Sequence, residues 1–238
     1  MVLCYHAVSD RWPDPLAVPP STLERHLRSL VASGFRPADL ATAARVGRAL
    51  HVTFDDAYRS VLRAIPMLDR LRLPATVFAC SALAETGAPL AVPELERRSA
   101  GYEDELATLD WEGLRALTER GIEIGSHTVT HPHLTQLSDG ELARELEESR
   151  DAVAASLGRP CPYVAYPYGE HDLRVRRAAS AAGYTAAFGL GGDVEHLPAY
   201  GLPRVDLYRR DGLVRLALKV SRLPLRRVVR ARRGRGHR

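Results

Sequence analysis

The segment Ala49-Leu-His-Val-Thr-Phe-Asp-Asp56 joins a short, mostly apolar run to two adjacent carboxylates. Its first six residues have the length and the β-branched and aromatic content of a buried strand, so we expect a strand that ends at Phe54. Asp55 and Asp56 then stand at the carboxyl end of that strand. Two adjacent buried carboxylates repel each other and lose hydration unless a cation shares their site. For either residue alone, an ordinary helix start is the alternative, because Asp is a favoured cap.

Strand-like and helix-like segments alternate on both sides of this segment. The expected strands are 2–5, 49–54, 75–79, 122–125, 163–166, 184–188 and 202–206. The expected helices begin at Ser21 or Thr22 and then span 39–47, 58–71, 111–120, 138–157, 172–183 and 212–220. Such alternation is typical of parallel strands joined by helices. The pattern predicts an α/β protein in which the strands form a closed or nearly closed β/α barrel, with polar residues at their carboxyl ends.

A second polar cluster follows the expected strand 122–125. The segment reads Gly125-Ser-His-Thr-Val-Thr-His-Pro-His133. If it makes a helical turn, His127 and His131 lie on one side and can reach the same metal ion. The pair alone is a weak signal, because histidines often cap loops or fill polar core sites. With one carboxylate it forms a three-ligand set that leaves coordination positions open, as catalytic sites do, and the second carboxylate is free to act as a base.

Charge is unevenly distributed along the 238 residues. Residues 222–238 contain eight arginines and no acidic residue, so their removal changes the formal net charge from +4 to −4. Such a segment suits an anionic membrane surface or another polyanion, and a solvated, disordered end is the alternative. A nucleic-acid-binding protein is disfavoured, because the remaining chain is acidic and does not interleave basic with aromatic residues.

The sequence also carries expectations about compartment and redox state. It shows neither a signal peptide nor a transmembrane segment, which predicts a cytoplasmic protein, peripheral to the membrane through its arginine-rich end. Cys4, Cys80 and Cys161 are widely spaced, so we expect reduced thiols instead of disulfides. The oligomeric state stays open.

Three segments in order resemble the signature motifs of the polysaccharide deacetylase family, which is also called the NodB-homology domain or carbohydrate esterase family 4. They are Thr53-Phe-Asp-Asp56, Ser126-His-Thr-Val-Thr-His-Pro132 and Ala165-Tyr-Pro-Tyr-Gly169. Leu3-Cys-Tyr-His6 and Leu202-Pro-Arg204 resemble the branch that includes poly-N-acetylglucosamine deacetylases. The resemblance covers residues 1–207. We therefore expect a catalytic domain over 1–210, a helix over 211–221 and a disordered tail over 222–238.

The resemblance implies a distorted (β/α)7 barrel in a single domain, and a metal-dependent hydrolase that removes N-acetyl groups from an N-acetylated sugar or polysaccharide. It implies that Asp56, His127 and His131 hold one divalent metal ion, zinc by default, with cobalt, nickel or manganese as alternatives. Asp55 is then the general base. The backbone N–H of Tyr168 is expected to help bind the oxyanion, in a turn where Tyr166 and Pro167 also serve the substrate.

Two functional groups depart from the usual family pattern. In many members the general acid is a histidine near the C-terminal end of the domain. In the branch resembled here the domain is permuted, and the resemblance implies His6 as the general acid, with a buried structural histidine as the alternative. Many members also carry an arginine before the Pro-Tyr-Gly turn, where Ala165 and Tyr166 stand in this chain. We expect Arg204 to orient Asp55 instead, with an ordinary salt bridge as the alternative.

The motifs leave other functions open. The same metal-binding residues suit an O-acetyl esterase or another C–N amide hydrolase on the same scaffold. A catalytically silent glycan-binding homologue is a further reading. It is disfavoured, because a silent site has no need to keep the charged cluster of Asp55, Asp56, His127 and His131.

Overall fold

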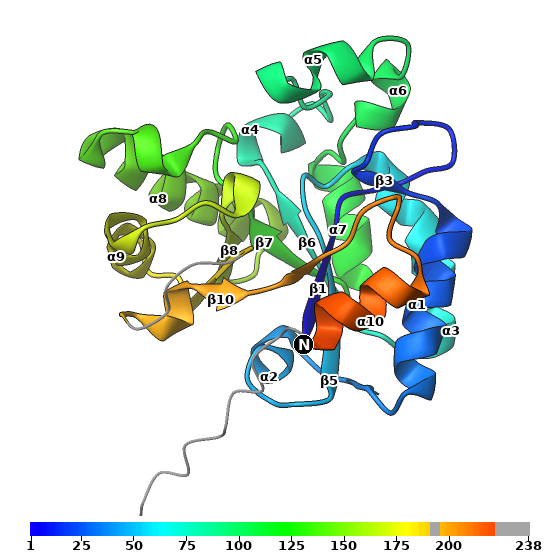
Figure 1. Ribbon diagram of the computed structural model, residues 1–238. Coiled ribbons are helices and arrows are strands. Elements are labelled where there is room, and N and C mark those ends of the chain that lie inside the picture. The colour runs from blue at the N-terminus through cyan, green and yellow to red at the C-terminus, as the bar shows by residue number, and fades with distance from the viewer. Residues whose placement is uncertain (191–195, 222–238) are drawn as a thin grey trace, which may run out of the picture.

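Parallel strands form a ring in the computed structural model, which describes residues 1–190 and 196–221 (Figure 1). Their order around the ring is β10-β9-β8-β7-β6-β5-β1-β11. The bounds are β1 (Val2–Tyr5), β5 (Ala49–Phe54), β6 (Ala75–Ala79), β7 (Glu123–Ser126), β8 (Tyr163–Ala165), β9 (Ala186–Gly189), β10 (Leu202–Pro203) and β11 (Val205–Asp206). This arrangement confirms the predicted α/β barrel.

Segment 202–206 closes the ring. β10 pairs with β9, and β11 pairs with β1, while only Arg204 separates β10 from β11 in the chain. The two short strands therefore occupy one strand position, and the ring has the seven positions of a distorted (β/α)7 barrel among the described residues. Arg204 therefore lies at the point where the ring of strands closes, between β10 and β11.

Helices surround the ring and connect its strands (Figure 1). They are α1 (Pro20–Ala32), α2 (Leu40–Ala43), α3 (Ile65–Leu71), α4 (Ser81–Ala84), α5 (Pro93–Ser99), α6 (Glu103–Leu106), α7 (Trp111–Glu119), α8 (Asp139–Leu157), α9 (Leu173–Ala181) and α10 (Leu213–Ser221). Short 3₁₀ turns are η1 (Arg59–Ala64), η2 (Leu134–Gln136), η3 (Pro167–Gly169) and η4 (Pro198–Tyr200). Three two-residue strands complete the elements: β2 (Ala7–Val8), β3 (Ala17–Val18) and β4 (Arg36–Pro37).

Several helix ends follow the capping chemistry of the sequence. The side chain of Ser138 accepts from the backbone N–H of Glu141 in a capping box, and Gly158 ends α8 in the left-handed conformation. The expected cap at Ser21 or Thr22 was wrong. α1 instead begins at Pro20, whose fixed φ and missing N–H suit the first turn of a helix.

The expected helix over 58–71 is divided. Its first part is the 3₁₀ turn η1, and α3 begins at Ile65 with Pro66 in its first turn. A proline there removes no helical hydrogen bond, whereas in the middle of one long helix it would. The segment 81–108, which lies outside all the expected strands and helices, contains the short helices α4, α5 and α6.

Apolar side chains pack on both sides of the strand ring. In β5, Leu50, Val52 and Phe54 belong to the large cluster that also contains the apolar faces of the helices. A smaller cluster includes Phe78, Ala165 and Phe188, contributed by β6, β8 and β9. Gly125 makes room for it, because a Cβ there would lie 2.5 Å from the Phe78 ring.

Within residues 1–190 and 196–221, none of the helices is both long and apolar enough to cross a membrane. The three cysteines are buried and free, as expected. The predicted disordered tail, 222–238, lies outside the described residues.

Candidate metal centre and active site

Three buried side chains converge at the carboxyl ends of β5 and β7. The ligand atoms of Asp56, His127 and His131 all lie within 4.8 Å of one another. Oδ1 of Asp56 is 3.4 Å from Nε2 of His127 and 3.3 Å from Nε2 of His131. The exposed fractions of these three residues are only 3%, 1% and 7%. The structure thus brings together the three ligands that the sequence predicted.

The spacing of these atoms fits a metal ion better than it fits hydrogen bonds. Two ligands about 2.1 Å from one tetrahedral ion are separated by about 3.4 Å, which is close to both measured distances. Among the described residues, buried Oδ1 of Asp56 has no hydrogen-bond partner. A buried carboxylate oxygen without a partner is costly, and a cation among the three ligands would remove that cost.

The ligands are positioned by hydrogen bonds from outside the site. Nδ1 of His127 lies 2.8 Å from the carbonyl oxygen of Ala165, which leaves Nε2 directed toward Asp56. Metal-binding histidines commonly have such a partner on their other nitrogen. Glu145 of α8 accepts from the backbone N–H groups of Val129 and Thr130, in the loop between the histidines. The sequence analysis missed Glu145, because nothing in its spacing connects α8 with this loop.

The histidine loop does not make the helical turn that would by itself bring two histidines four residues apart to one side. Residues 127–131 are irregular, and both Thr128 and His131 have positive φ, at 73° and 65°. The rings of His127 and His131 approach edge to face, with centroids 4.9 Å apart. Asp56 and Ala57 also have positive φ. Strained backbone of this kind persists when the surrounding structure holds it, and it collects at functional sites.

Asp55 forms a two-point ion pair with Arg204. Nη1 and Nη2 of Arg204 lie 2.6 and 2.8 Å from the two carboxylate oxygens, and both side chains are buried. Nη1 also donates to Oγ1 of Thr53, which stands on the same face of β5 as Asp55. Burial alone would raise the pKa of Asp55, but the nearby charge of Arg204 and the surrounding histidines lower it well below its usual range. Asp55 is therefore ionised, with its carboxylate plane fixed.

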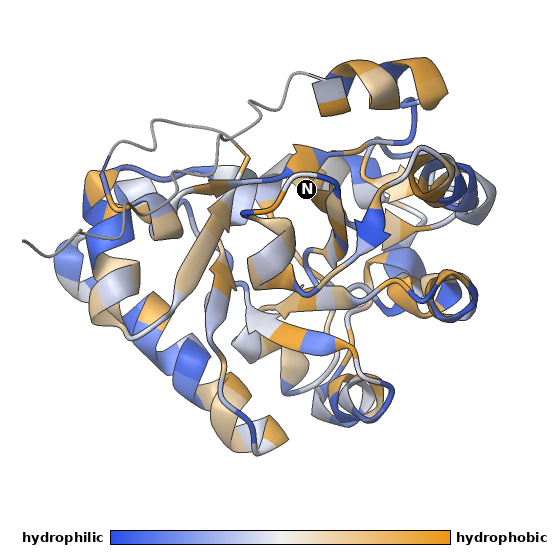
Figure 2. Ribbon diagram, turned by 90° about the horizontal axis from the view of Figure 1, so that it is seen from below, coloured by the Kyte–Doolittle hydropathy of each residue, from blue (hydrophilic) through white to orange (hydrophobic). Residues whose placement is uncertain are grey.

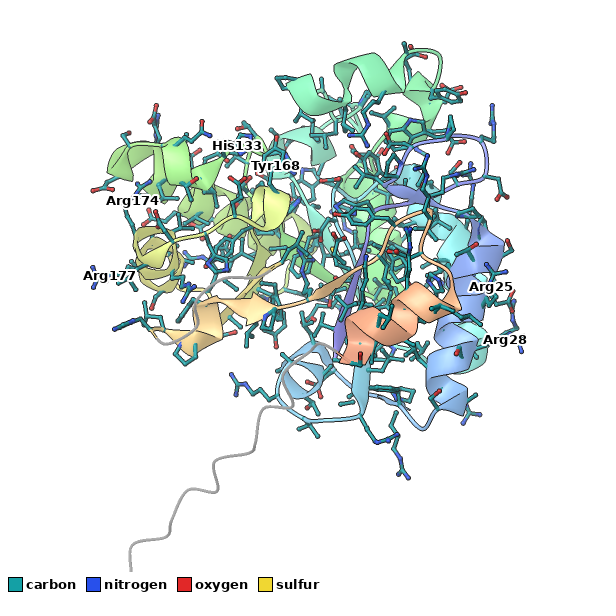
Figure 3. The ribbon with its side chains drawn as sticks, viewed as in Figure 1. Arg25, Arg28, His133, Tyr168, Arg174 and Arg177 are labelled. Atoms are coloured by element: carbon teal, nitrogen blue, oxygen red, sulfur yellow. The ribbon has the colours of Figure 1, made fainter. Side chains whose placement is uncertain are left out.

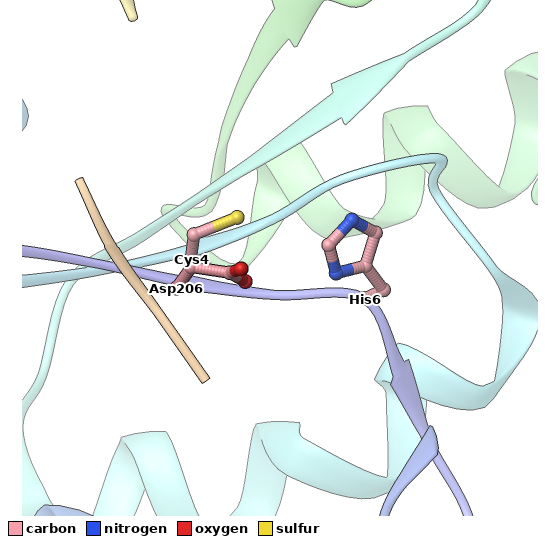
Figure 4. Close-up of side chains that lie close together, drawn as sticks. All are labelled: Cys4, His6 and Asp206. Atoms are coloured by element: carbon pink, nitrogen blue, oxygen red, sulfur yellow. The ribbon is translucent and has the colours of Figure 1, made fainter. Parts of the chain in front are cut away.

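His6 lies in a second polar group beside this pair. Ligand atoms of His6, Cys4 and Asp206 lie within 4.8 Å of one another, and Figure 4 shows the Asp206 carboxylate turned toward the His6 ring. Nδ1 of His6 and Oδ1 of Asp206 have no hydrogen-bond partner among the described residues. Sγ of Cys4 contacts Oδ2 of Asp55 at 3.4 Å, a neighbour that the sequence analysis did not identify. Cys4 of β1 pairs with Asp206 of β11, and this register brings Asp206 next to Cys4 and His6.

The turn at the end of β8 completes the site. Tyr168 has a φ of 59°, and its ring packs edge to face on His131, with centroids 4.8 Å apart. On its other side the ring stacks on His133 at 3.8 Å, and Figure 3 shows both side chains at this edge of the barrel. The ring of Tyr168 is thus in contact with His131, one of the three metal-ligand candidates.

Tyr166 differs from the expectation that it contacts substrate. Its side chain is buried, and its hydroxyl donates to the carbonyl oxygen of Tyr200 at 2.9 Å. Pro167 is buried as well. Both residues therefore shape the turn that carries Tyr168, and neither side chain offers a surface to a sugar.

The pKa values of the two candidate histidine ligands are shifted in opposite directions. Burial lowers the pKa of His131 to about 4, so its ring is neutral near pH 7, as metal binding requires. Burial also acts against charge on His127, but the carboxylates of Asp55 and Asp56 outweigh it and raise the pKa of His127. The two carboxylates therefore favour positive charge at this position, either on the His127 ring or on a bound cation.

Comparison with known proteins identifies a family and relatives to which the chain is similar. The sequence model described as polysaccharide deacetylase matches residues 43–187, more than half of the chain. YxkH of Bacillus subtilis (strain 168), which carries the same family name, is 23% identical over 192 residues. That alignment covers 77% of this chain and 61% of YxkH, so the chain spans about three fifths of the length of this relative.

Solved structures share the fold. A polysaccharide deacetylase from Bacillus cereus superimposes with a TM-score of 0.74 at 20% identity, covering 92% of this chain and 68% of the other. IcaB from Ammonifex degensii superimposes with a TM-score of 0.68 at 22% identity, covering 87% and 90% of the two chains. At these identities the likeness establishes the barrel, and the chemistry has to be argued from the residues of this chain.

Proposed function

Because the chain belongs to the polysaccharide deacetylase family, we propose that it is a metal-dependent hydrolase that removes N-acetyl groups from an N-acetylated sugar or polysaccharide. The observation that carries this proposal is the buried group of Asp56, His127 and His131 directly beside the ion-paired Asp55. Three ligands and an adjacent carboxylate are the parts that a metal-assisted hydrolysis needs.

Asp56, His127 and His131 would hold the metal ion, and zinc suits two imidazoles and one carboxylate. A bound divalent ion supplies positive charge that polarises the acetyl carbonyl and lowers the pKa of water. Cobalt, nickel and manganese are alternatives with the same ligands.

In the proposed reaction, Asp55 accepts a proton from the attacking water while the water oxygen bonds to the acetyl carbon. Arg204 donates to both carboxylate oxygens and the Cys4 thiol donates also to Oδ2, so a lone pair on Oδ1 remains for the proton. Arg204 therefore acts as a positioning residue, which keeps Asp55 ionised and correctly oriented. Oriented groups of this kind lower the barrier because they need no rearrangement during the reaction.

The remaining steps use groups on the other side of the site. The backbone N–H of Tyr168 would donate to the carbonyl oxygen as negative charge develops there. His6 would give a proton to the amide nitrogen as the C–N bond breaks, which releases acetate and a free amine. Asp206, turned toward His6, would help to orient the ring.

The test is acetate release from N-acetylglucosamine oligomers by the metal-loaded protein. We expect release by the wild type, and loss of release both after chelation and in Asp55→Asn. Release from O-acetylated sugars alone would identify an esterase instead. If the wild type binds metal but releases acetate from neither substrate, the proposed activity is rejected and a catalytically silent homologue is favoured.

A further inference from the structure

Exposed aliphatic side chains gather on α10. Among the described residues, the large hydrophobic side chains that are exposed are Val46, Leu62, Leu213, Val214 and Leu218. Three of these five belong to α10, and Val214 is the most exposed at 75%. Single exposed aliphatic residues are ordinary, but several on one short helix indicate a surface with a partner.

α10 is apolar on two opposite sides. Leu216 is buried, and Val220 packs against the core of the domain, so this side is accounted for. Val214 and Leu218 are four residues apart and therefore share the other side. In Figure 2 the helix lies at the periphery of the molecule, with hydrophobic residues along its outer surface. The fold itself leaves this outer face, composed of Val214 and Leu218, without a protein partner among the described residues, and Leu213 is exposed at the start of the helix.

Positive charge accompanies this outer face. Residues 212–238 contain ten basic residues and no acidic residue, whereas the chain before them carries excess negative charge. Arg215 is exposed on α10 itself. Lys219 is different, because its ammonium group is held by Asp211 at 2.6 Å and by the carbonyl oxygen of Asp206 at 2.7 Å. Lys219 therefore fixes α10 to the barrel, and Arg215 with the arginines beyond α10 supplies unbalanced positive charge.

We propose that the outer face of α10 is a docking surface for an anionic lipid bilayer. The basic residues 222–238, which follow α10 in the sequence, would add attraction to the same bilayer. A helix with aliphatic residues on one face and basic residues next to them binds in the interface of a membrane. Basic residues near an anionic bilayer add attraction. The inference extends the sequence-based expectation from the arginines alone to a specific helix face, and it does not depend on the proposed deacetylase activity.

Two other partners fit the surface less well. Nucleic acid binds through contacts to phosphate and bases, and it gives exposed Leu and Val side chains little to pack against. A second copy of the chain would bring two sets of ten positive charges together, which repel each other. A bilayer of anionic phospholipid satisfies the aliphatic face and the charge at the same time.

The position of α10 is compatible with activity at the membrane. α10 contacts α1 on the outer wall of the barrel, whereas the candidate site lies at the carboxyl ends of the strands (Figure 1). A bilayer on the outer face of α10 therefore leaves Asp55 and the metal ligands accessible from another direction.

The test is co-sedimentation of the full chain with phosphatidylcholine vesicles that either contain or lack phosphatidylglycerol. We expect binding only to the anionic vesicles, and weaker binding as salt rises above about 0.1 M, because salt screens the charges. Val214→Asp/Leu218→Asp should lower the vesicle partition coefficient at least about tenfold, since two aliphatic groups no longer enter the interface. Truncation after Ser221 should also lower it, because eight arginines are lost.

Val46→Asp/Leu62→Asp is the matched control, because these side chains are comparably exposed, at 48% and 44%, on other elements. It should bind vesicles like the wild type. Circular dichroism and acetate release from a soluble oligomer check that the α10 variant remains folded. Equal vesicle binding by the α10 variant and the wild type would overturn the proposal. So would binding of duplex DNA without vesicle binding, or a concentration-dependent dimer that the α10 substitutions abolish.

Discussion

Strand β5 carries polar side chains at both ends, and the two ends are built differently. At the amino end, buried His51 has both ring nitrogens satisfied, at 2.9 Å from the carbonyl oxygen of Ala38 and 2.9 Å from Oγ1 of Thr76. At the carboxyl end, buried Asp56 keeps an oxygen without a hydrogen-bond partner among the described residues, and its φ is 65°. One end is complete as a protein structure. The other end becomes complete only with a ligand.

This difference separates stability from function along a single strand. A satisfied buried group contributes to folding, whereas an unsatisfied one on strained backbone lowers stability and persists for another reason. In parallel barrels the carboxyl ends of the strands hold the chemistry, and the amino ends hold the fold together. Substitutions at the two ends of β5 should therefore have opposite effects on activity and on stability.

The largest effect is expected for Asp56→Asn at the carboxyl end. Loss of the anionic ligand should lower kcat/KM for acetate release at least about a thousandfold, because metal activation is worth several kcal/mol. The metal-free variant should be about as stable as the wild type, since a neutral amide replaces a buried charge beside two histidine rings and Asn tolerates positive φ. Urea unfolding with chelator present measures this second effect. A clear loss of stability would show that Asp56 is a structural residue.

Substitutions in the ion pair of Asp55 and Arg204 test whether the carboxyl end of β5 also contributes to the stability of the fold. Arg204→Met leaves a buried carboxylate without its partner, which should lower the free energy of unfolding by about 3–5 kcal/mol. Asp55→Asn/Arg204→Met removes both charges and should recover most of that loss, while activity stays absent. Denaturant unfolding of the two single variants and the double variant gives the coupling energy. Additive losses of stability would contradict a strong pair.

At the amino end, His51 should make the fold sensitive to acid. Burial lowers the pKa of His51 to about 4, against 6.5 for an unperturbed histidine. Above pH 6.5 neither state binds the proton. Between pH 6.5 and 4 the unfolded chain binds it and the folded chain does not, so stability falls as pH falls, by up to about 3 kcal/mol. Below pH 4 both states are protonated and the difference is constant.

His51→Gln should remove this part of the pH dependence, because Gln stays neutral and can bond to both former partners. Thermal or urea unfolding between pH 4 and 7 measures the difference between wild type and variant. Activity of the folded variant near neutral pH should be unchanged. Parallel pH profiles for the two proteins would mean that His51 is not the group that titrates.

Much of this comparison could be predicted from the sequence, and the reasons for the remainder are physical. The strand over 49–54 was predicted with its correct bounds, because a short buried run ends in polar residues. The convergence of Asp56 with His127 and His131 followed from parallel strands that end at one edge. The path of the histidine loop could not be predicted, because the spacing of two histidines does not reveal positive φ at Thr128 and His131.

Contacts between distant elements were the hardest to predict. Arg204 was expected to reach Asp55, but its two-point geometry depends on the closure of the barrel by segment 202–206. The approach of Cys4 to Asp55 depends on the same register between β1 and its neighbours. The exposed apolar face of α10 was not predicted, because the sequence of an apolar helix does not indicate which of its sides the rest of the protein covers.

The smallest of the expected effects is the stabilisation of the carboxyl end of β5 by metal. Oδ1 of Asp56 has no hydrogen-bond partner among the described residues and would bind the metal ion. Metal binding should then raise the free energy of unfolding by about 2.7 kcal/mol at a hundredfold excess over Kd. Thermal unfolding with zinc and with chelator measures the shift, and His51→Gln should show the same shift as the wild type because its amino end takes no part in binding. Asp56→Asn should show little or none. A shift in Asp56→Asn as large as in the wild type would place the metal elsewhere and remove the distinction between the two ends, whereas a shift confined to proteins with Asp56 would show that the strand is completed by the ion.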